Sequence, residues 1–357
     1  MMLIAPELQG PDGTLRRRLA DIEQRFAAEL LSDIEPVNTL VGYVERYRGK
    51  MLRPTLLLAS AEAAYGPEGF EAHGEAFAVL ATVVEMVHMA TLVHDDVLDE
   101  AEVRRRGKTV NALRGNEAAV MLGDYLISHA YHLCSSLPRP GGRAGGVSLG
   151  RVIASATNTV CEGELLQLAH RNDWRLNRRT YFEIIRRKTA SLCGLCCRLP
   201  ALVVGDPEGP GTTPAALTEF GEKLGIAFQI VDDLLDLTGD PETVGKSLGR
   251  DLAKGKLTLP MIELLERAEA DRAVPGGAGL QERLARQADE SLPGEVRERE
   301  AAELAGLALS SGALAAAKDR ADQLVADASD AVRQALPDTP GRAVLLDLAG
   351  RVLTRKA

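Results

Sequence analysis

The chain has 357 residues, of which 45% are hydrophobic, 4% aromatic and 26% charged, with a formal net charge of −9. These fractions exclude collagen-like, disordered and disulfide-rich proteins, and the acidic balance argues against a nucleic-acid partner, which selects a basic face. Composition alone would also argue against an anionic substrate, an inference that the motifs below overturn. A chain of this length leaves room for one large domain or two.

Cysteine usage and the chain start predict the compartment. The five cysteines are an odd number, which is typical of reduced thiols and a cytoplasmic protein. The first ten residues lack the basic and apolar regions of a signal peptide. Residues 77–93 are the strongest candidate for a membrane span, but Glu85 and His88 interrupt them. Because a span needs about 20 apolar residues, we expect a buried core helix and no transmembrane segment.

Taken in chain order, long stretches rich in Ala, Leu, Glu and Arg alternate with short Gly/Pro breakers. Apolar residues recur at helical spacing, as in Leu217, Phe220 and Leu224. Thr213 before Pro214 marks a helix start. Strand-like alternation is almost absent, so we predict ten or more helices and no sheet. The breakers lie at residues 66–69, 138–142, 205–207, 239–241 and 275–277.

The helical segments predict one domain over residues 1–357. Its core is expected at about 15–265, followed by a polar surface insertion at 268–300 and C-terminal helices at 301–357. The insertion shows no continuous apolar face, which predicts exposed helices or loops. Residues 140–150 are interpreted as a flexible loop between two core helices, since both flanks are apolar.

One short motif occurs twice, as LVHDDVLD and as QIVDDLLD. Both copies have the form D-D-x-x-D within an apolar helical pattern. Asp95 and Asp99 therefore share a helix face, as do Asp232 and Asp236. Paired carboxylates repel and lose hydration on an apolar helix, and their hard oxygen atoms suit Mg²⁺ that also binds phosphate. A single D-D-x-x-D motif could arise by chance on a solvated polar helix face. A second copy of the motif in an equally apolar setting argues against chance and predicts metal binding.

Basic residues accompany both motifs. Arginine forks and lysine point charges are the usual phosphate ligands, although each one alone is more typical of a solvated surface. Together they predict a pocket for more than one diphosphate, hidden within an acidic chain. These residues are Lys50, Arg53, Arg104, Arg105, Arg106, Lys188, Lys246 and Lys256.

At this point the sequence resembles the all-trans polyprenyl diphosphate synthases of the isoprenyl (farnesyl/geranylgeranyl type) synthase family. The resemblance covers about residues 15–265 and rests on ordered motifs, among them GKMLRP, LVHDDVLDEAEVRRRGKTVN, EGELLQ, RRKTASL, FQIVDDLLDLTGD and GKSLGRDLAKGKLTLP. It implies an all-α, isoprenoid synthase-type helical bundle around a deep central cavity, usually a homodimer. Arg106 stands where the family has glycine, with Gly107 one residue later, and we expect no loss of activity.

The resemblance assigns roles to three sets of residues. The ligands or near-ligands of about three Mg²⁺ ions are Asp95, Asp99, Asp232 and Asp236. The isopentenyl diphosphate site comprises Lys50, Arg53, His88 and Arg105. The partners of the allylic diphosphate are Arg104, Lys188, Thr189, Gln229, Lys246 and Lys256.

The predicted reaction is elongation of an allylic diphosphate by successive isopentenyl diphosphates. The allylic C–O bond ionises only when metal ions, Lys and Arg neutralise the leaving diphosphate. The double bond of isopentenyl diphosphate then attacks the cation, and the released diphosphate accepts the lost proton. Lys188 and Thr189 are predicted to steady the cation through a carbonyl and a hydroxyl. Glu162, Glu164 and Gln167 are predicted to orient basic side chains rather than to act directly.

Product length is predicted from the residues one turn before Asp95, which lie roughly 6–7.5 Å deeper along the helix. Short-chain relatives commonly carry a bulky aromatic residue there, whereas this chain has Thr91 and Ala90, with Val87 deeper still. We therefore expect a product longer than C20, of the octaprenyl type, suited to a quinone side chain. The alternatives are a farnesyl or geranylgeranyl synthase, the catalytic subunit of a heterodimeric synthase, and a cyclase or head-to-head condensing enzyme. A non-catalytic partner subunit is a further alternative, but such subunits generally lack one aspartate motif, and here both are intact.

Two further features are predicted to be structural. Cys193, Cys196 and Cys197 contain a C-x-x-C pattern, but no second pair or histidine pair completes a zinc site. We expect packed thiols within a helix. His94, beside the first aspartate pair, is expected to be a packed histidine or an indirect neighbour of the site.

Overall fold

The computed structural model describes most of the chain. The described residues are 14–47, 49–104, 107–138, 148–206, 211–238, 249–270, 279–289 and 291–355. They are almost entirely helical, which confirms the predicted fold class. They form two compact units, and each is considered by itself. Unit 1 comprises Met1–Asn158, Leu192–Gly221 and Ser329–Leu348, and unit 2 comprises Thr159–Ser191, Glu222–Ala328 and Ala349–Ala357.

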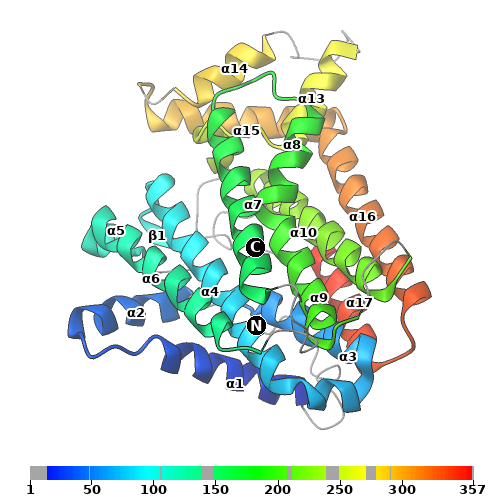
Figure 1. Cartoon of the computed structure of the whole chain (residues 1–357). Helices are drawn as coiled ribbons and strands as arrows, with labels where there is room; N and C mark the ends of the chain where they lie inside the picture. Colours follow the sequence, from blue (N-terminus) through cyan, green and yellow to red (C-terminus); the bar gives the residue numbers. More distant parts are fainter. Residues whose placement is uncertain are drawn as a thin grey trace. The chain divides into compact units, whose positions relative to one another are not determined.

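Figure 1 shows the helices in chain order. The elements wholly or mainly in unit 1 are α1 (Thr14–Glu29), α2 (Glu35–Tyr47), α3 (Leu52–Ala72), α4 (Gly74–Leu98), β1 (Val103–Arg104), β2 (Gly107–Lys108), α5 (Val110–Arg114), α6 (Asn116–Ser135) and α9 (Ser191–Val204). Those of unit 2 are α8 (Arg178–Ile185), η3 (Arg186–Ala190), α12 (Arg250–Ala253), α13 (Leu259–Ala270), α14 (Leu280–Gln287) and α15 (Gly294–Ser310). Residues of both units occur in α7 (Leu149–Ala169), α10 (Thr213–Thr238), α16 (Ala313–Ala335) and α17 (Pro340–Leu353).

Helix α4 forms the core of unit 1, where it packs against α1, α3, α5 and α6. Among the described helices it is the one long and apolar enough to cross a membrane, and 72% of its apolar window is buried inside the protein. Burial of this extent is expected of a core helix, which is the structure predicted for residues 77–93. The partly exposed His94 ring packs against α6, because a Cβ atom on Gly123 would lie 2.1 Å from it. The prediction of a packed His94 is confirmed.

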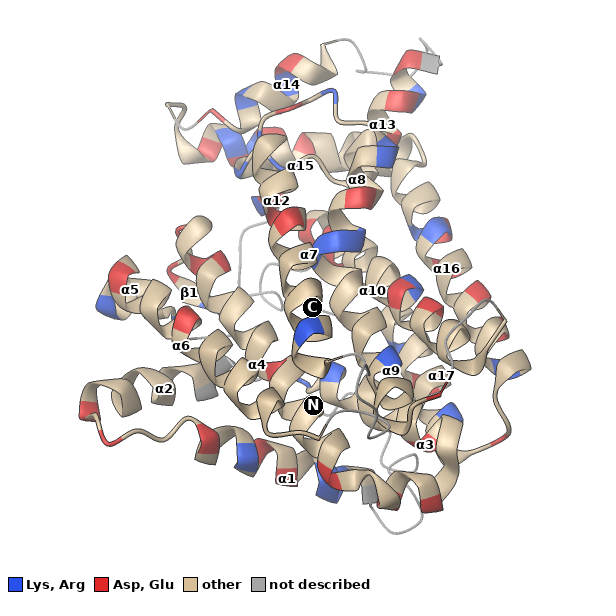
Figure 2. Cartoon of the chain, in the orientation of Figure 1, with Lys and Arg blue, Asp and Glu red and all other residues tan. Residues whose placement is uncertain are grey.

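The polar segment at 268–300 holds α14 and the start of α15, which pack against each other. Figure 2 shows acidic and basic residues interspersed along both helices, whereas α4 carries few charges. Leu280 and Leu284 are nevertheless fully buried on α14. The expectation that this segment has no apolar face is therefore wrong. Two leucines are sufficient to form an apolar face on an eight-residue helix. They are too few to show a helical period in the sequence.

Two local predictions are corrected by the structure. β1 and β2 form a two-residue antiparallel pair, with Val103 opposite Lys108, where no strand was expected. Such a short pair carries no alternation to detect. Helix α10 begins at Thr213, one residue earlier than expected, and the Thr212 hydroxyl accepts the Ala215 N–H at 3.4 Å. Its N-cap is thus Thr212 rather than Thr213.

The three clustered cysteines lie within α9. Cys193, Cys196 and Cys197 are buried and carry free thiols. Burial raises the pKa of each of these thiols, which suppresses the reactive thiolate form. The prediction of packed cysteines is confirmed.

Candidate active site

The second aspartate motif lies in the last two turns of α10, where the helix carbonyls leave a partial negative charge. Asp232 is 52% exposed at its side chain, whereas Asp233 is 3% exposed. Burial, and then the negative charge of Asp251, raise the pKa of Asp236 to about 7. Crowded carboxylates at a helix C-terminus would be stabilised by a cation.

The C-terminal segment supplies one cation to this motif. The Arg355 guanidinium places Nη1 3.1 Å from Oδ1 of Asp232. It also lies over the Phe228 ring, 4.3 Å from the ring centroid, at a position one turn before Asp232. Arginine stacked on an aromatic face is held by a cation–π interaction. Sequence reasoning missed Arg355, because it lies more than a hundred residues from the motif.

Asp236 has a different set of partners. Its carboxylate oxygens accept the backbone N–H groups of Arg250 at 3.2 Å and Asp251 at 3.1 Å, at the start of α12. Within the described part of the chain, no three His, Cys, Asp or Glu side chains gather as ready metal ligands. The donor type still fits Mg²⁺, because carboxylate oxygens are its preferred protein ligands. The pKa of Asp236 is raised first by burial and then by the negative charge of Asp251, and a bound cation would offset both effects.

A pocket of about 90 Å³ lies beside the buried Asp233. It brings together four residues predicted for the allylic diphosphate, namely Lys188, Thr189, Gln229 and Lys256. Other polar lining residues are Gln167, His170, Tyr181, Asp251 and Thr258. Of these, His170, Tyr181, Asp251 and Thr258 were missed. Asp251 and Thr258 lie within the quoted motif GKSLGRDLAKGKLTLP, whereas no pattern points to His170 or Tyr181.

Lys188 and Thr189 lie in η3, a single π-helical turn, a feature often found at functional sites. Two glycines allow close approach to this turn. A Cβ atom on Gly163 of α7 would lie 2.4 Å from the Lys188 backbone nitrogen, and one on Gly225 of α10 would lie 2.6 Å from Ala190 Cα. Because such contacts are shorter than side chains tolerate, only glycine fits at both positions. Helices α7 and α10 thus fix the backbone of the π-turn.

The EGELLQ motif on α7 supplies the partners of Lys188. The Lys188 ammonium donates a hydrogen bond of 3.0 Å to Oε1 of Gln167 and forms an ion pair with Glu164. These contacts confirm the prediction that Glu164 and Gln167 orient a basic side chain. The lysine is therefore held at the pocket wall by two side chains of one helix.

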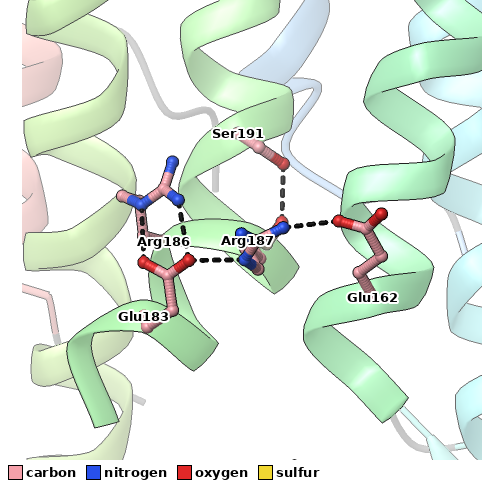
Figure 3. Close-up of polar contacts among 5 residues, drawn as sticks. All are labelled: Glu162, Glu183, Arg186, Arg187 and Ser191. Atoms are coloured by element: carbon pink, nitrogen blue, oxygen red, sulfur yellow. Dashed lines mark hydrogen bonds and ion pairs between the residues drawn. The ribbon is translucent and has the colours of Figure 1, made fainter. Parts of the chain in front are cut away.

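Ion pairs also brace the neighbouring arginines (Figure 3). Glu183 accepts hydrogen bonds from Arg186 at 2.9 Å and from Arg187 at 2.5 Å, and these guanidinium groups hold the pKa of the Glu183 carboxyl below its usual value. Arg187 also binds Glu162 of α7 at 2.5 Å, so Glu162 has its predicted orienting contact. The Ser191 hydroxyl donates to the Arg187 carbonyl at 2.6 Å. The π-turn is thereby tied to α7 and α8.

The first aspartate motif ends α4 in unit 1. Asp95 and Asp99 are half-buried at the helix C-terminus, and the Asp99 N–H donates to the Asp95 carbonyl at 2.8 Å. Asp96 is 1% exposed, and its Oδ1 accepts hydrogen bonds from Nε and Nη2 of Arg104, both at 2.8 Å. Arg104, predicted to bind the allylic diphosphate, is thus engaged by the central aspartate of the motif.

The remaining predicted residues of unit 1 differ in burial. Lys50 is exposed, and His88 is half-buried. Arg53 is half-buried, and its buried Nε has no hydrogen-bond partner. Arg105 and Lys246 lie outside the described residues.

The three predicted chain-length residues lie on α4 before the first motif. Val87 and Ala90 are fully buried. Thr91 is half-buried and donates to the His88 carbonyl at 2.7 Å. Val87 and Thr91 precede Asp95 by eight and four residues, so they lie on the same side of the helix as this carboxylate.

Residues 35–289 match the family described as polyprenyl synthetase. The octaprenyl diphosphate synthase of Escherichia coli is 34% identical over 332 residues, which cover 93% of this chain and 94% of that enzyme. The chain belongs to the polyprenyl synthetase family. This membership confirms the family recognised from the motifs and the predicted enzyme class, a trans-polyprenyl diphosphate synthase.

Other members of the polyprenyl synthetase family differ in product and in bound groups. A short-chain isoprenyl diphosphate synthase of Methanothermobacter thermautotrophicus is 35% identical over 260 residues, 72% of this chain and 76% of that enzyme. A crystal structure of polyprenyl synthase from Caulobacter crescentus, complexed with calcium and isoprenyl diphosphate, has a TM-score of 0.82 and 29% identity and covers 100% of both chains. These likenesses confirm the isoprenoid synthase-type helical fold.

Proposed function

We propose that the protein condenses an allylic diphosphate with successive isopentenyl diphosphates and releases an all-trans polyprenyl diphosphate of the octaprenyl type, suited to a quinone side chain. The observation that carries this proposal is the pocket beside Asp233. There Lys188 and Lys256 meet hydroxyl and amide groups at the end of the helix that bears the second aspartate motif. Lysines bind phosphate, while the adjoining carboxylates suit a divalent cation.

The cation that we propose is Mg²⁺, at about three ions per active site. The residues that would hold it are Asp95, Asp99, Asp232 and Asp236. Both pairs lie at C-terminal helix ends, where a cation is favoured by the helix dipole. When bound, Mg²⁺ neutralises diphosphate charge as a Lewis acid. The calcium and isoprenyl diphosphate bound by the Caulobacter enzyme support a cation-assisted diphosphate site.

The protein's own groups bind and orient the two substrates. Lys188 and Lys256, which line the pocket beside Asp233, hold the allylic diphosphate. Arg104 and Lys246 are proposed as further partners of the same diphosphate. Thr189 steadies the positive charge that develops when the C–O bond breaks.

In unit 1, Lys50, Arg53, His88 and Arg105 bind isopentenyl diphosphate, and the buried Arg53 Nε has a hydrogen bond left to donate. The isopentenyl double bond then attacks the allylic cation. The new bond forms at C1 of the allylic unit, and the departing diphosphate takes the proton that is lost.

Family membership alone does not fix the product length, because relatives of similar identity carry both octaprenyl and short-chain names. Helix α4 carries Thr91, Ala90 and Val87 before the first motif, and none of these side chains is large. A chain that grows along this helix therefore meets no aromatic ring at that level. We propose that these three residues permit elongation beyond C20.

We also propose that the enzyme is a cytoplasmic homodimer. All five cysteines are free, which is typical of a reducing compartment. Leu113 on α5 and Val120 and Met121 on α6 expose 37%, 41% and 64% of their surface. Neighbouring exposed apolar side chains of this kind favour an interface with a second copy.

The test is a single incubation of purified protein with farnesyl diphosphate, labelled isopentenyl diphosphate and Mg²⁺, followed by sizing of the products. The proposal expects a ladder that ends beyond C20. Products that stop at C15 or C20 would identify a short-chain synthase. Activity that needs a smaller partner protein would identify the catalytic subunit of a heterodimer, and label-free cyclic products would identify a cyclase.

A further inference from the structure

A buried tyrosine lies on α8, the helix that leads into the π-turn with Lys188 and Thr189, and the proposed reaction gives it no direct use. Tyr181 on α8 is 3% exposed, and its hydroxyl donates a 2.5 Å hydrogen bond to Oδ2 of Asp233, itself 3% exposed. A polar pair this deeply buried costs desolvation free energy that packed apolar side chains would not. The pair therefore calls for an explanation beyond packing.

Asp233 connects Tyr181 to the pocket. Because Tyr181 engages Oδ2, the other oxygen, Oδ1, is left to accept a hydrogen bond from Nε2 of Gln229 at 2.9 Å. A Gln side chain has one donor end and one acceptor end. With its nitrogen committed to Asp233, Gln229 must turn its oxygen towards Thr189, whose hydroxyl donates to it at 3.0 Å.

This chain of hydrogen bonds decides the polarity of the Thr189 hydroxyl. A hydroxyl has one proton to donate and two lone pairs. When the proton is committed to Gln229, the lone pairs are what Thr189 can present to the pocket that it lines. Lone pairs directed at a developing carbocation stabilise it, whereas an O–H proton in the same place would not.

The backbone around Thr189 leaves little other freedom. The close approaches of Gly163 and Gly225 fix the π-turn from two sides. With the backbone fixed, the hydrogen bond to Gln229 sets the direction of the Thr189 hydroxyl proton.

We propose that Tyr181 is a positioning residue that acts through Asp233 and Gln229 to make Thr189 present its lone pairs to the allylic cation. The proposal deepens the proposed function and rests on it, because the reaction supplies the cation. It also separates the second motif into two parts. Asp233 orients the amide, while Asp232 and Asp236 remain for the metal.

The test is a double-mutant cycle of Tyr181→Phe and Thr189→Val, with kcat and both KM values measured for farnesyl and isopentenyl diphosphates. Tyr181→Phe removes one O–H group and is expected to lower kcat about tenfold, the usual consequence of one lost buried hydrogen bond, with KM for isopentenyl diphosphate unchanged. In the Thr189→Val background, Tyr181→Phe is expected to lower kcat by about twofold or less, because the effects of coupled residues are not additive. In a Thr189→Ser background, which keeps the hydroxyl, Tyr181→Phe is again expected to lower kcat about tenfold.

Tyr65→Phe is the matched control, since the Tyr65 hydroxyl also donates to a carboxylate, Asp206, at 3.0 Å within unit 1. A readout without substrate is hydrogen exchange of the Gln229 side-chain amide, followed by NMR on ¹⁵N-glutamine protein. The amide is expected to exchange at least several-fold faster in Tyr181→Phe, and at the wild-type rate in Tyr65→Phe.

Additive effects in the cycle, or an amide that exchanges equally fast in all three proteins, would overturn the positioning role. Failure of the proposed function is distinguishable, because wild-type protein would then form no product while the amide protection could still be measured.

Discussion

The two aspartate motifs have the same D-D-x-x-D pattern at the end of a long apolar helix, but they satisfy their buried central carboxyl in different ways. In α4, Asp96 binds the Arg104 guanidinium. In α10, Asp233 has the neutral partners Tyr181 and Gln229, and burial raises its pKa well above the usual value. The first motif thus buries an ion pair, and the second a hydrogen-bond network. Identical sequence spacing does not dictate identical electrostatics.

The motifs also differ one turn earlier along each helix. Thr91 precedes Asp95 by four residues, whereas Phe228 precedes Asp232 by four. The Phe228 ring carries Arg355, which in turn binds Asp232. The first motif therefore has a small residue in the place where the second has an aromatic platform for a cation. We infer that the helix of the first motif accommodates the growing chain, while that of the second anchors the C-terminal segment.

The largest effect is expected where the motifs are proposed to act alike. Asp95→Ala and Asp232→Ala should each lower turnover by about 10³-fold or more, because each removes a carboxylate proposed to hold Mg²⁺. Circular dichroism should show an unchanged helical fold. Asp327→Ala, on the exposed face of α16, is the control and should keep full activity. If either motif variant turned over at a near-normal rate, that motif would have no role in the metal site.

The central aspartates should differ in stability. Asp96→Asn removes the counter-charge of Arg104 and is expected to lower the free energy of unfolding by about 2 kcal/mol, less than a fully buried pair because Arg104 is partly exposed. Asp233→Asn keeps a polar side chain among neutral partners and is expected to cost about 1 kcal/mol. Urea denaturation of both variants measures the difference. Equal costs, or the reverse order, would contradict the contrast between ion pair and neutral network.

Giving α4 the aromatic residue that α10 has should shorten the product. Thr91→Phe places a ring one turn below Asp95, and chromatography of the products should show a ladder that ends earlier. Thr91→Val, which is nearly isosteric, should leave the ladder unchanged. Ala90→Phe should also shorten the product. Because Ala90 is fully buried, a ring there overpacks the core at a cost of about 1–3 kcal/mol. The unfolding midpoint of this variant must therefore be compared with that of the wild type. A product of unchanged length in both phenylalanine variants would rule out this account of chain length.

Sequence pattern was sufficient for what depends on local spacing. The helical fold, the core helix over residues 77–93, and the orienting role of Glu162, Glu164 and Gln167 towards basic side chains follow from periodicity and motifs. The partner of Arg104, by contrast, depends on how the chain turns after α4. Tyr181 and Arg355 meet the second motif from segments 52 and 123 residues away in sequence. Nothing in one sequence marks such tertiary partners, because a lone tyrosine or a terminal arginine has many equally plausible environments.

The smallest expected effect concerns Arg355, which has no described counterpart at the first motif. Its guanidinium occupies an oxygen of Asp232 that Mg²⁺ would use, so the two cations compete. Arg355→Ala should therefore raise the affinity for Mg²⁺ in the absence of substrate, by up to about fivefold, the limit set by a partly exposed ion pair. Titration calorimetry measures this, with Arg333→Ala on the surface of α16 as the control. The gain should persist in an Asp95→Ala background and disappear in an Asp232→Ala background, because the competition belongs to the second motif alone. If Arg355→Ala instead weakened Mg²⁺ binding, the arginine would assist the second motif rather than compete for it, and the contrast between the two helices would lie only in their central aspartates.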